Sequence, residues 1–277
     1  TTGVPHIIYS ILSLGWRGSV RQWKLQIIAG ILLSAIILPI FVSVHSIVSW
    51  DFGTAMSVEA WHSTVFAPYF VIGAVHSGVS AVVTVMIILR WMFHWENYIR
   101  REHMDSLAKL LIVVATAWLF FFALEFFFGL YALEGPEVAL RELQVFEAPW
   151  KWYFLTFLIT SYLIPVPMWL IPSVRRNLWL MAFTTILVNV GMWFERFIII
   201  VPGLMRKQAF VFTWGGYTPS IVEVTIITAT FAMVSMLVLL FAKVVPLIPI
   251  GDAKEGMILH DEIKIGKVMV PAVMREE

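Results

Sequence analysis

The sequence has 277 residues and no cysteine. Iron–sulfur clusters are held by Cys thiolates, and a disulfide needs two Cys side chains. The chain therefore can neither ligate such a cluster by thiolate nor form a disulfide. Any iron–sulfur centre that acts with it is expected to belong to a partner subunit.

Charged residues are also scarce. They make up 13% of the chain, whereas ordinary soluble domains contain about 25%. Hydrophobic residues account for 60%, and six apolar stretches reach the length of about 20 residues with which a helix crosses a bilayer. We predict an all-α, polytopic transmembrane helix bundle of about six spans in a lipid bilayer. The predicted spans are Leu25–Trp50, Thr64–Met92, Leu107–Tyr131, Trp150–Ile171, Leu178–Pro202 and Ser220–Pro246.

The sequence starts with Thr-Thr-Gly-Val-Pro and lacks both an initial methionine and the basic segment and short apolar core of a signal peptide. No signal peptide is therefore predicted. Residues 1–24, in which Trp16 and Trp23 alternate with Arg, suit an amphipathic segment at the cytoplasmic surface. We divide the chain into this interfacial lead-in, a six-helix bundle over residues 25–250 and a polar cytoplasmic tail over residues 251–277.

The positions of Lys and Arg predict the orientation. In a six-span arrangement most of them fall on one side of the membrane, and cytoplasmic loops carry the excess of positive charge. Both termini are therefore predicted to be cytoplasmic. The basic residues on that side are Arg17, Arg21, Lys24, Arg90, Arg100, Arg101, Lys109, Arg175, Arg176, Lys243, Lys254, Lys264, Lys267 and Arg275.

Small residues and prolines predict local features of the spans. Gly73 and Gly78, with Ala and Ser between them, favour close approach of a neighbouring helix. Pro39, Pro165 and Pro167 lie inside predicted spans. Because proline removes a backbone donor and clashes with the preceding turn, these positions predict kinks or local unwinding.

Ionisable side chains inside spans are costly and mark cavities, ion pathways or proton relays. Those of this chain fall in the outer third of the predicted bundle, apart from one histidine near mid-depth. We predict that they converge on one polar site or relay that opens toward the outer face. They are His45, Asp51, His62, His76, Glu125, Glu195, Arg196 and Glu223.

Structural roles are alternatives for several of these residues. His45 and His76 also fit neutral imidazoles that bond to backbone carbonyls. Glu195 and Arg196 are adjacent, about 100° apart around a helix, so Arg196 is expected to pair with a carboxylate on another span. Glu125 has no partner in its own helix and is a candidate proton carrier.

The histidines raise the question of haem. His62 and His76 are fourteen residues apart, a spacing that would align two haems along one helix. Two haems need a second pair of histidines on a facing span, and His45 alone does not supply it. We therefore predict no haem or metal site in this chain.

Three blocks of sequence are long and specific: "SVHSIVSWDFGTAMSVEAWHSTVFAPYFVIGA", "RWMFHWENYI" and "ILVNVGMWFERFIIIV". They resemble the larger NrfD-like (polysulfide reductase type) integral membrane subunit of bacterial alternative complex III, and the similarity runs from Tyr9 to Ile250. Members of that family resemble two stacked helix bundles. The first bundle has no counterpart here, so the chain resembles the C-terminal portion.

The resemblance implies a subunit that binds and oxidises quinol, in particular menaquinol, near the outer face of the bacterial inner (cytoplasmic) membrane. It implies three kinds of partner: an outer-face iron–sulfur subunit, multihaem cytochrome subunits and a second NrfD-like membrane subunit. It implies no nucleic acid partner and no redox centre in this chain. By the same resemblance, Asp51 falls on the acidic position associated with the quinol site, and His45 and His62 flank it.

Glu125, Glu195 and Arg196 match positions associated with the proton-conducting interior. We place His76, which lies near mid-depth, in the same proton relay. The leading hypothesis is therefore a subunit of a quinol:electron-acceptor oxidoreductase complex that handles protons and passes electrons to its partners. Two alternatives stay open. One is a proton-translocating unit, and the other is a structural anchor in which the polar residues serve helix packing.

Overall fold

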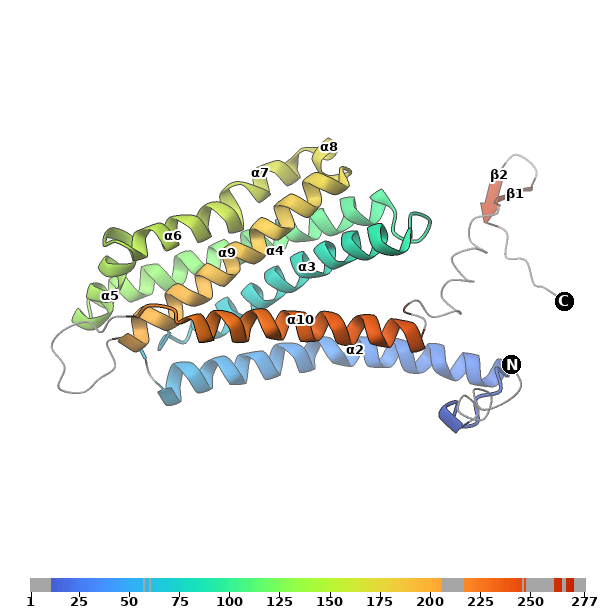
Figure 1. The fold of residues 1–277 in the computed structure, drawn as a ribbon, viewed down its shortest axis with the longest axis horizontal. Helices are drawn as coiled ribbons and strands as arrows, with labels where there is room; N and C mark the ends of the chain where they lie inside the picture. The colour runs from blue at the N-terminus through green and yellow to red at the C-terminus, as the bar shows by residue number, and fades with distance from the viewer. Residues whose placement is uncertain are drawn as a thin grey trace.

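The structure is a computed structural model, and it describes residues 11–56, 58–59, 61–205, 217–245, 247, 262–265 and 268–271. Most of the predicted tail lies outside these residues. Figure 1 shows the helices and a short hairpin. In chain order the elements are α2 (Val20–Trp50), η1 (Asp51–Met56), α3 (Phe66–Phe93), α4 (Arg101–Tyr131), α5 (Gly135–Phe146), α6 (Trp150–Leu158), η2 (Ile159–Leu163), α7 (Pro165–Leu170), α8 (Pro172–Arg175), α9 (Leu178–Met205), α10 (Ile221–Val244), β1 (Glu262–Ile265) and β2 (Val268–Pro271).

Six helical segments are long and apolar enough to cross a membrane, which confirms the predicted all-α, multi-pass architecture. The first begins earlier than predicted, at Val20, because Ser19 and Gln22 form a capping box that satisfies the free amides of the first turn. It also continues beyond Trp50 through the π-helical turn η1. The strands β1 and β2 pair antiparallel within the predicted tail.

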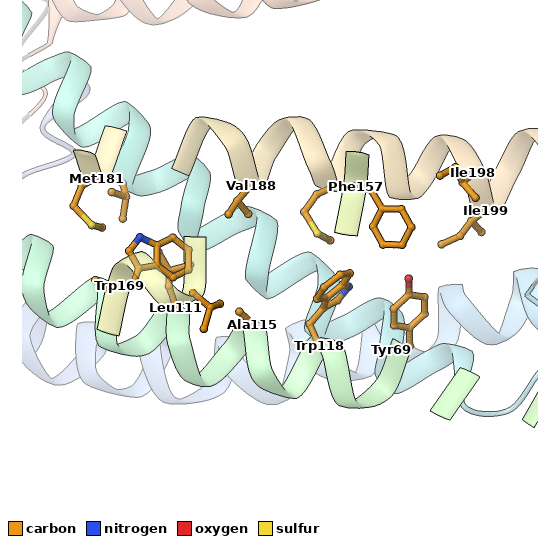
Figure 2. Packing of buried hydrophobic residues seen from close by; sticks show 14 of the residues in the cluster. Tyr69, Leu111, Ala115, Trp118, Phe157, Trp169, Met181, Val188, Ile198 and Ile199 are labelled. Atoms are coloured by element: carbon orange, nitrogen blue, oxygen red, sulfur yellow. The ribbon is translucent and has the colours of Figure 1, made fainter. Parts of the chain in front are cut away.

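Four spans form the packed bundle. Helix α3 packs against α4 and α9, and α9 packs in turn against α6 and η2. Figure 2 shows the core between them, where Trp118 and Tyr69 lie near Phe157 at one end and Trp169 lies near Met181 at the other. Burying large aromatic rings supplies much of the packing contact in this core.

Helices α2 and α10 lie outside this bundle (Figure 1). Their apolar side chains are mostly exposed, and the most apolar window of each is 0% buried within the chain. Helix α2 packs on α3, whereas no described element packs extensively against α10. Their surfaces are suited to contact with lipid or with other membrane helices, because hydrocarbon is the solvent that such surfaces match.

The fourth span is irregular, as its prolines predict. It runs as α6, the π-helix η2 and α7, and Pro165 begins α7 directly after η2. Proline at that position removes a helical hydrogen bond, and a π-turn is one way to absorb the change. Pro39, in contrast, lies inside the uninterrupted helix α2.

Ion pairs and hydrogen bonds connect the helices at the end of the bundle opposite to α5. Asp105 of α4 accepts a hydrogen bond from Arg175 Nε at 2.8 Å and lies 2.6 Å from Lys109 Nζ. Arg175 also donates to the backbone carbonyl of Trp169 at 2.8 Å. These contacts hold the turn around α8 against the beginning of α4.

Some of the glycines in the bundle allow a neighbouring group to approach the helix closely. A Cβ on Gly191 of α9 would lie 2.9 Å from the backbone nitrogen of Ser161 in η2 and would clash with its hydroxyl. A Cβ on Gly73 would clash with the guanidinium of Arg196, so Gly73 makes room for a charged side chain. Gly78 faces open space, and the predicted close contact is not seen there.

We predict that Gly191→Ala lowers the free energy of unfolding by about 1–3 kcal/mol, because the added methyl group forces α9 away from η2. The matched control is Gly78→Ala, which has no neighbour within 4 Å and should leave stability equal or higher by up to about 1 kcal/mol. Thermal unfolding of the detergent-solubilised variants measures both. Equal stabilities of the two variants would contradict the close contact.

Candidate functional site

Most of the buried ionisable residues that the structure describes form two groups at the end of the bundle where α5 lies. This is the predicted outer end. We call them the Glu195 cluster (Tyr69, Trp118, Glu195 and Arg196) and the Arg141 cluster (Ser63, Glu125, Glu137, Arg141 and Gln144). Of the residues predicted to converge on one site, Glu125 and Glu195 both line one small cavity between the clusters.

Glu195 of α9 is 1% exposed and joins three helices. Its Oε1 accepts hydrogen bonds from the hydroxyl of Tyr69 on α3 and, at 2.7 Å, from the indole nitrogen of Trp118 on α4. Figure 2 shows Tyr69 beside Trp118, with Phe157, Ile198 and Ile199 near its hydroxyl. Donors on both neighbouring helices fix the carboxylate in place.

In the described part of the chain, Arg196 does not form the predicted ion pair with a carboxylate on another span. Among the described residues its ion-pair contact is with its neighbour, Nε to Glu195 Oε2 at 3.7 Å, and not with a carboxylate on another span. Its guanidinium lies 4.7 Å from the ring centre of Phe70, a cation–π contact. The space left by Gly73 lets the side chain fold along α3, which explains the difference.

The Arg141 cluster contains an almost completely buried guanidinium. Arg141 of α5 is 4% exposed, and its Nη2 lies 2.7 Å from Glu137 Oε1 and 3.7 Å from Glu125 Oε1. The hydroxyl of Ser63 donates to the other oxygen of Glu125 at 2.5 Å. Glu125 therefore has partners, but they come from outside its own helix.

Sequence reasoning missed Arg141 and Glu137, because their segment was interpreted as an outer loop. It forms the helix α5, whose buried face carries Glu137, Leu140, Arg141, Leu143 and Gln144. The spacing of three and four residues within this set is that of one helix face, and Glu137 and Arg141 are an i,i+4 ion pair. That spacing was the available signal.

His62 lies at the mouth of this cluster. Its Nε2 is 3.3 Å from Glu134 Oε2, and its Nδ1 is 3.8 Å from Glu137 Oε2. A cavity of about 320 Å³ opens there, lined by these three side chains together with Ser63 and Glu125 among others. We call it the acidic pocket, because three carboxylates meet there with one imidazole.

A second, apolar pocket of about 250 Å³ lies between η1, α3 and α9. Among the described residues, Arg196 is the one charged side chain that lines it. Of its lining residues on α9, Ile200 and Leu204 are exposed apolar side chains. We call it the apolar pocket; its lining residues are Phe52, Met56, Trp61, Phe66, Phe70, Arg196, Ile199, Ile200 and Leu204.

Asp51, His45 and His62 are not brought into one pocket in the described part of the chain. Asp51 is exposed and begins η1, next to Phe52 of the apolar pocket. The His45 ring lies 2.9 Å from the carbonyl of Phe41 through Nδ1, as expected for a structural histidine, and 6.4 Å from the Phe70 ring. His62 belongs to the acidic pocket.

His76 is completely buried in α3, and neither ring nitrogen has a hydrogen-bond partner among the described residues. Its ring packs 5.6 Å from that of Trp118. It therefore lies behind the Glu195 cluster, toward the middle of the bundle, without a hydrogen bond to it. The alternative in which His76 bonds to a backbone carbonyl is not seen.

The described residues contain no group of three or more His, Asp or Glu side chains arranged to hold a metal ion. What the arrangement offers is an apolar pocket suited to a flat ring, a cation at its wall, and buried carboxylates and hydroxyls that accept and donate protons.

Comparisons with known proteins agree with this geometry. The family described as "Polysulphide reductase, NrfD" matches residues 7–208. The chain is 26% identical over 226 residues to the Hdr-like menaquinol oxidoreductase integral membrane subunit of Archaeoglobus fulgidus, a match that covers 75% of this chain and 55% of that protein. It is 25% identical over 237 residues to a Halobacterium salinarum protein described as a putative membrane subunit of dimethyl sulfoxide reductase, and here the match covers 76% and 52%. The chain thus spans about half the length of these curated relatives.

We predict that Arg141→Met strongly destabilises the protein, because it leaves Glu125 and Glu137 buried together without their cation. Removing one partner of a buried ion pair costs about 3–5 kcal/mol. The matched control is Arg176→Met, which changes an exposed arginine and should alter stability by no more than about 0.5 kcal/mol. Thermal unfolding in detergent measures both, and similar values for the two variants would show that the Arg141 cluster does not hold α5 to the bundle.

Proposed function

Because this chain belongs to the polysulphide reductase NrfD family, we propose that it is a quinol-binding and quinol-oxidising membrane subunit of an electron-transfer complex. The observation that carries the proposal is the apolar pocket, which opens between lipid-facing side chains and is walled on one side by Arg196 next to the buried Glu195. An apolar ring carrying two ionisable hydroxyls matches such a pocket. The name of the Archaeoglobus fulgidus relative, a menaquinol oxidoreductase subunit, favours menaquinol as the substrate.

The pocket has the properties that a quinol ring requires. Its walls include the aromatic rings of Phe52, Trp61, Phe66 and Phe70, which stack on flat apolar ligands. Its volume of about 250 Å³ is close to the lower end of the range for small-molecule sites. The exposed Ile200 on its rim gives a lipid-dissolved molecule a direct way in from the bilayer.

Quinol oxidation releases two protons and two electrons. We assign the first proton acceptors to Asp51 and His45, with His62 close by, because carboxylates and imidazoles accept protons near neutral pH. The geometry that supports this places Asp51 next to Phe52 of the pocket and the His45 ring near Phe70. His62 is better placed for proton release, since it lies in the acidic pocket.

Glu125, Glu195, Arg196 and His76 are the proposed interior of the proton relay. Glu125 and Glu195 are assigned to the relay because both line the same small cavity. Arg196 lines the apolar pocket and its Nε lies 3.7 Å from Glu195 Oε2, so it connects the pocket with the relay. His76 extends the polar residues toward mid-depth, behind Trp118.

The electrons leave through partner subunits, because no redox centre is assigned to this chain. The proposed partners are an outer-face iron–sulfur subunit, multihaem cytochrome subunits and a second NrfD-like membrane subunit, in a bacterial inner membrane complex of the alternative complex III type. The exposed surfaces of α2 and α10 leave room for membrane partners.

We predict that Asp51→Asn lowers quinol-dependent reduction of the electron acceptor by about a hundredfold in the assembled complex, since a positioned proton acceptor contributes at least about that much. Glu147→Gln is the matched control, an exposed carboxylate at the same end, and should leave turnover unchanged. Turnover per assembled complex is the measurement. Full turnover with Asp51→Asn would overturn the assignment, and impaired assembly with normal turnover per complex would favour the structural-anchor alternative.

We predict that Ile200→Trp raises the KM for quinol at least severalfold, because the indole occupies space in the apolar pocket. Ile186→Trp makes the same change on the same helix, at a side chain of similar exposure (48% against 44%) that does not line the pocket. Steady-state kinetics with a short-chain quinol compare the two variants. Equal KM values would place the quinol elsewhere.

A further inference from the structure

The two pockets are separated by a third, much smaller cavity of about 10 Å³. It lies inside the bundle and is shared by both polar clusters. Its polar lining residues are Tyr69, Glu125, Arg141, Gln144 and Glu195, and its apolar lining is Phe122, Phe126, Phe154, Phe157, Ile198 and Ile199. A polar cavity of this size accommodates a single water molecule.

The polar atoms around the cavity are incompletely satisfied. In the described part of the chain, Glu195 Oε2 and Arg141 Nε have no hydrogen-bond partner, although both are buried. One is an acceptor and the other a donor, and both residues line the cavity, so a water there has unsatisfied groups of both kinds in its walls. Tyr69 and Gln144 offer further hydrogen-bonding groups, which brings the number of potential partners into the range that buried waters use.

The walls of the small cavity are shared with the two pockets. Glu125 lines both the small cavity and the acidic pocket, and Ile199 lines both the small cavity and the apolar pocket. Arg196 of the apolar pocket lies directly beside Glu195 of the small cavity. The three spaces therefore follow one another through the outer end of the bundle.

We propose that the small cavity holds one water that passes protons between Glu195 and Glu125, so that the apolar pocket, this water and the acidic pocket form one proton exit path. A proton that the ring hydroxyl releases to its first acceptor, Asp51 or His45, reaches Glu195, crosses the water to Glu125 and leaves through the acidic pocket at His62. Only protons follow this path. The two electrons of each quinol go to the redox centre of a partner subunit.

The side chains have different roles along the path. Glu195, Glu125 and His62 bind and release protons. Arg141 is a positioning residue, because a guanidinium stays protonated and does not relay protons itself. Its Nη2 lies 3.7 Å from a carboxylate oxygen of Glu125 and 2.7 Å from one of Glu137, so it holds the two carboxylates in place.

This path rests on the proposed function, since quinol is the source of the protons, but the water is tested without quinol. X-ray pulses convert bound water to hydroxyl radicals, which modify the side chains next to it. In the purified complex we expect modification of Tyr69 and Phe157, although they are only 2% and 1% exposed. Trp169 is the internal control, because it is 0% exposed, more reactive than phenylalanine and does not line the cavity. Labelling of Tyr69 and Phe157 no higher than that of Trp169 overturns the proposal.

A second measurement tests proton passage. Glu125→Gln should lower the quinol oxidation rate of the complex by about a hundredfold and raise its solvent deuterium isotope effect, because the proton route is interrupted. Glu147→Gln, outside the path, should change neither quantity. An unchanged rate and isotope effect in Glu125→Gln, with normal quinol turnover in the unmodified complex, rejects the path and leaves the proposed function standing. A lack of quinol turnover in the unmodified complex rejects the proposed function itself, whatever the labelling shows.

Discussion

The outer end of this bundle depends on the hydrogen bonds that the carboxylate of Glu195 accepts. Glu195 sits on α9 and accepts hydrogen bonds from Tyr69 on α3 and Trp118 on α4, so that one buried group fixes three spans relative to one another. In the membrane interior a buried carboxylate without hydrogen-bond partners would cost several kcal/mol. The helices can therefore pack only in the arrangement that brings these donors to it.

The same constraint explains the second cluster. Arg141 is buried between Glu125 of α4 and Glu137 of its own helix, and Gln144 one turn further on donates to the carbonyl of Ile198 at 3.1 Å. These contacts draw the short amphipathic helix α5 over the end of the bundle. They also put three carboxylates close to one guanidinium and one imidazole.

The small residues determine where charges fit. Gly73 leaves space for Arg196, and Gly191 lets α9 approach the π-helix η2. Arg196, in the space beside Gly73, lines the apolar pocket between α3, α9 and η1. The proposed quinol site and the proposed proton path are therefore consequences of how two helices pack, as well as of which residues they carry.

Some features of the fold and of the candidate site were predictable from the sequence, and others were not. The six spans followed, because apolar length alone identifies a helix that crosses a bilayer. The shared depth of Glu125 and Glu195 also followed, since depth is a count of residues along a helix. The interruption near Pro165 was predictable from the missing backbone donor.

What the sequence by itself determined was the solvent of this protein, the number of its membrane-spanning helices and the depth of its ionisable groups. Only the tertiary structure decided the partners. It paired Glu125 with Ser63 and Arg141, turned Arg196 onto Phe70 beside its own neighbour, and left Asp51 outside the pocket that His62 lines. The physical reason is rotation. Helix length fixes how deep a residue lies, but the direction in which it points depends on how each helix turns to pack against the others, and no local pattern specifies that angle.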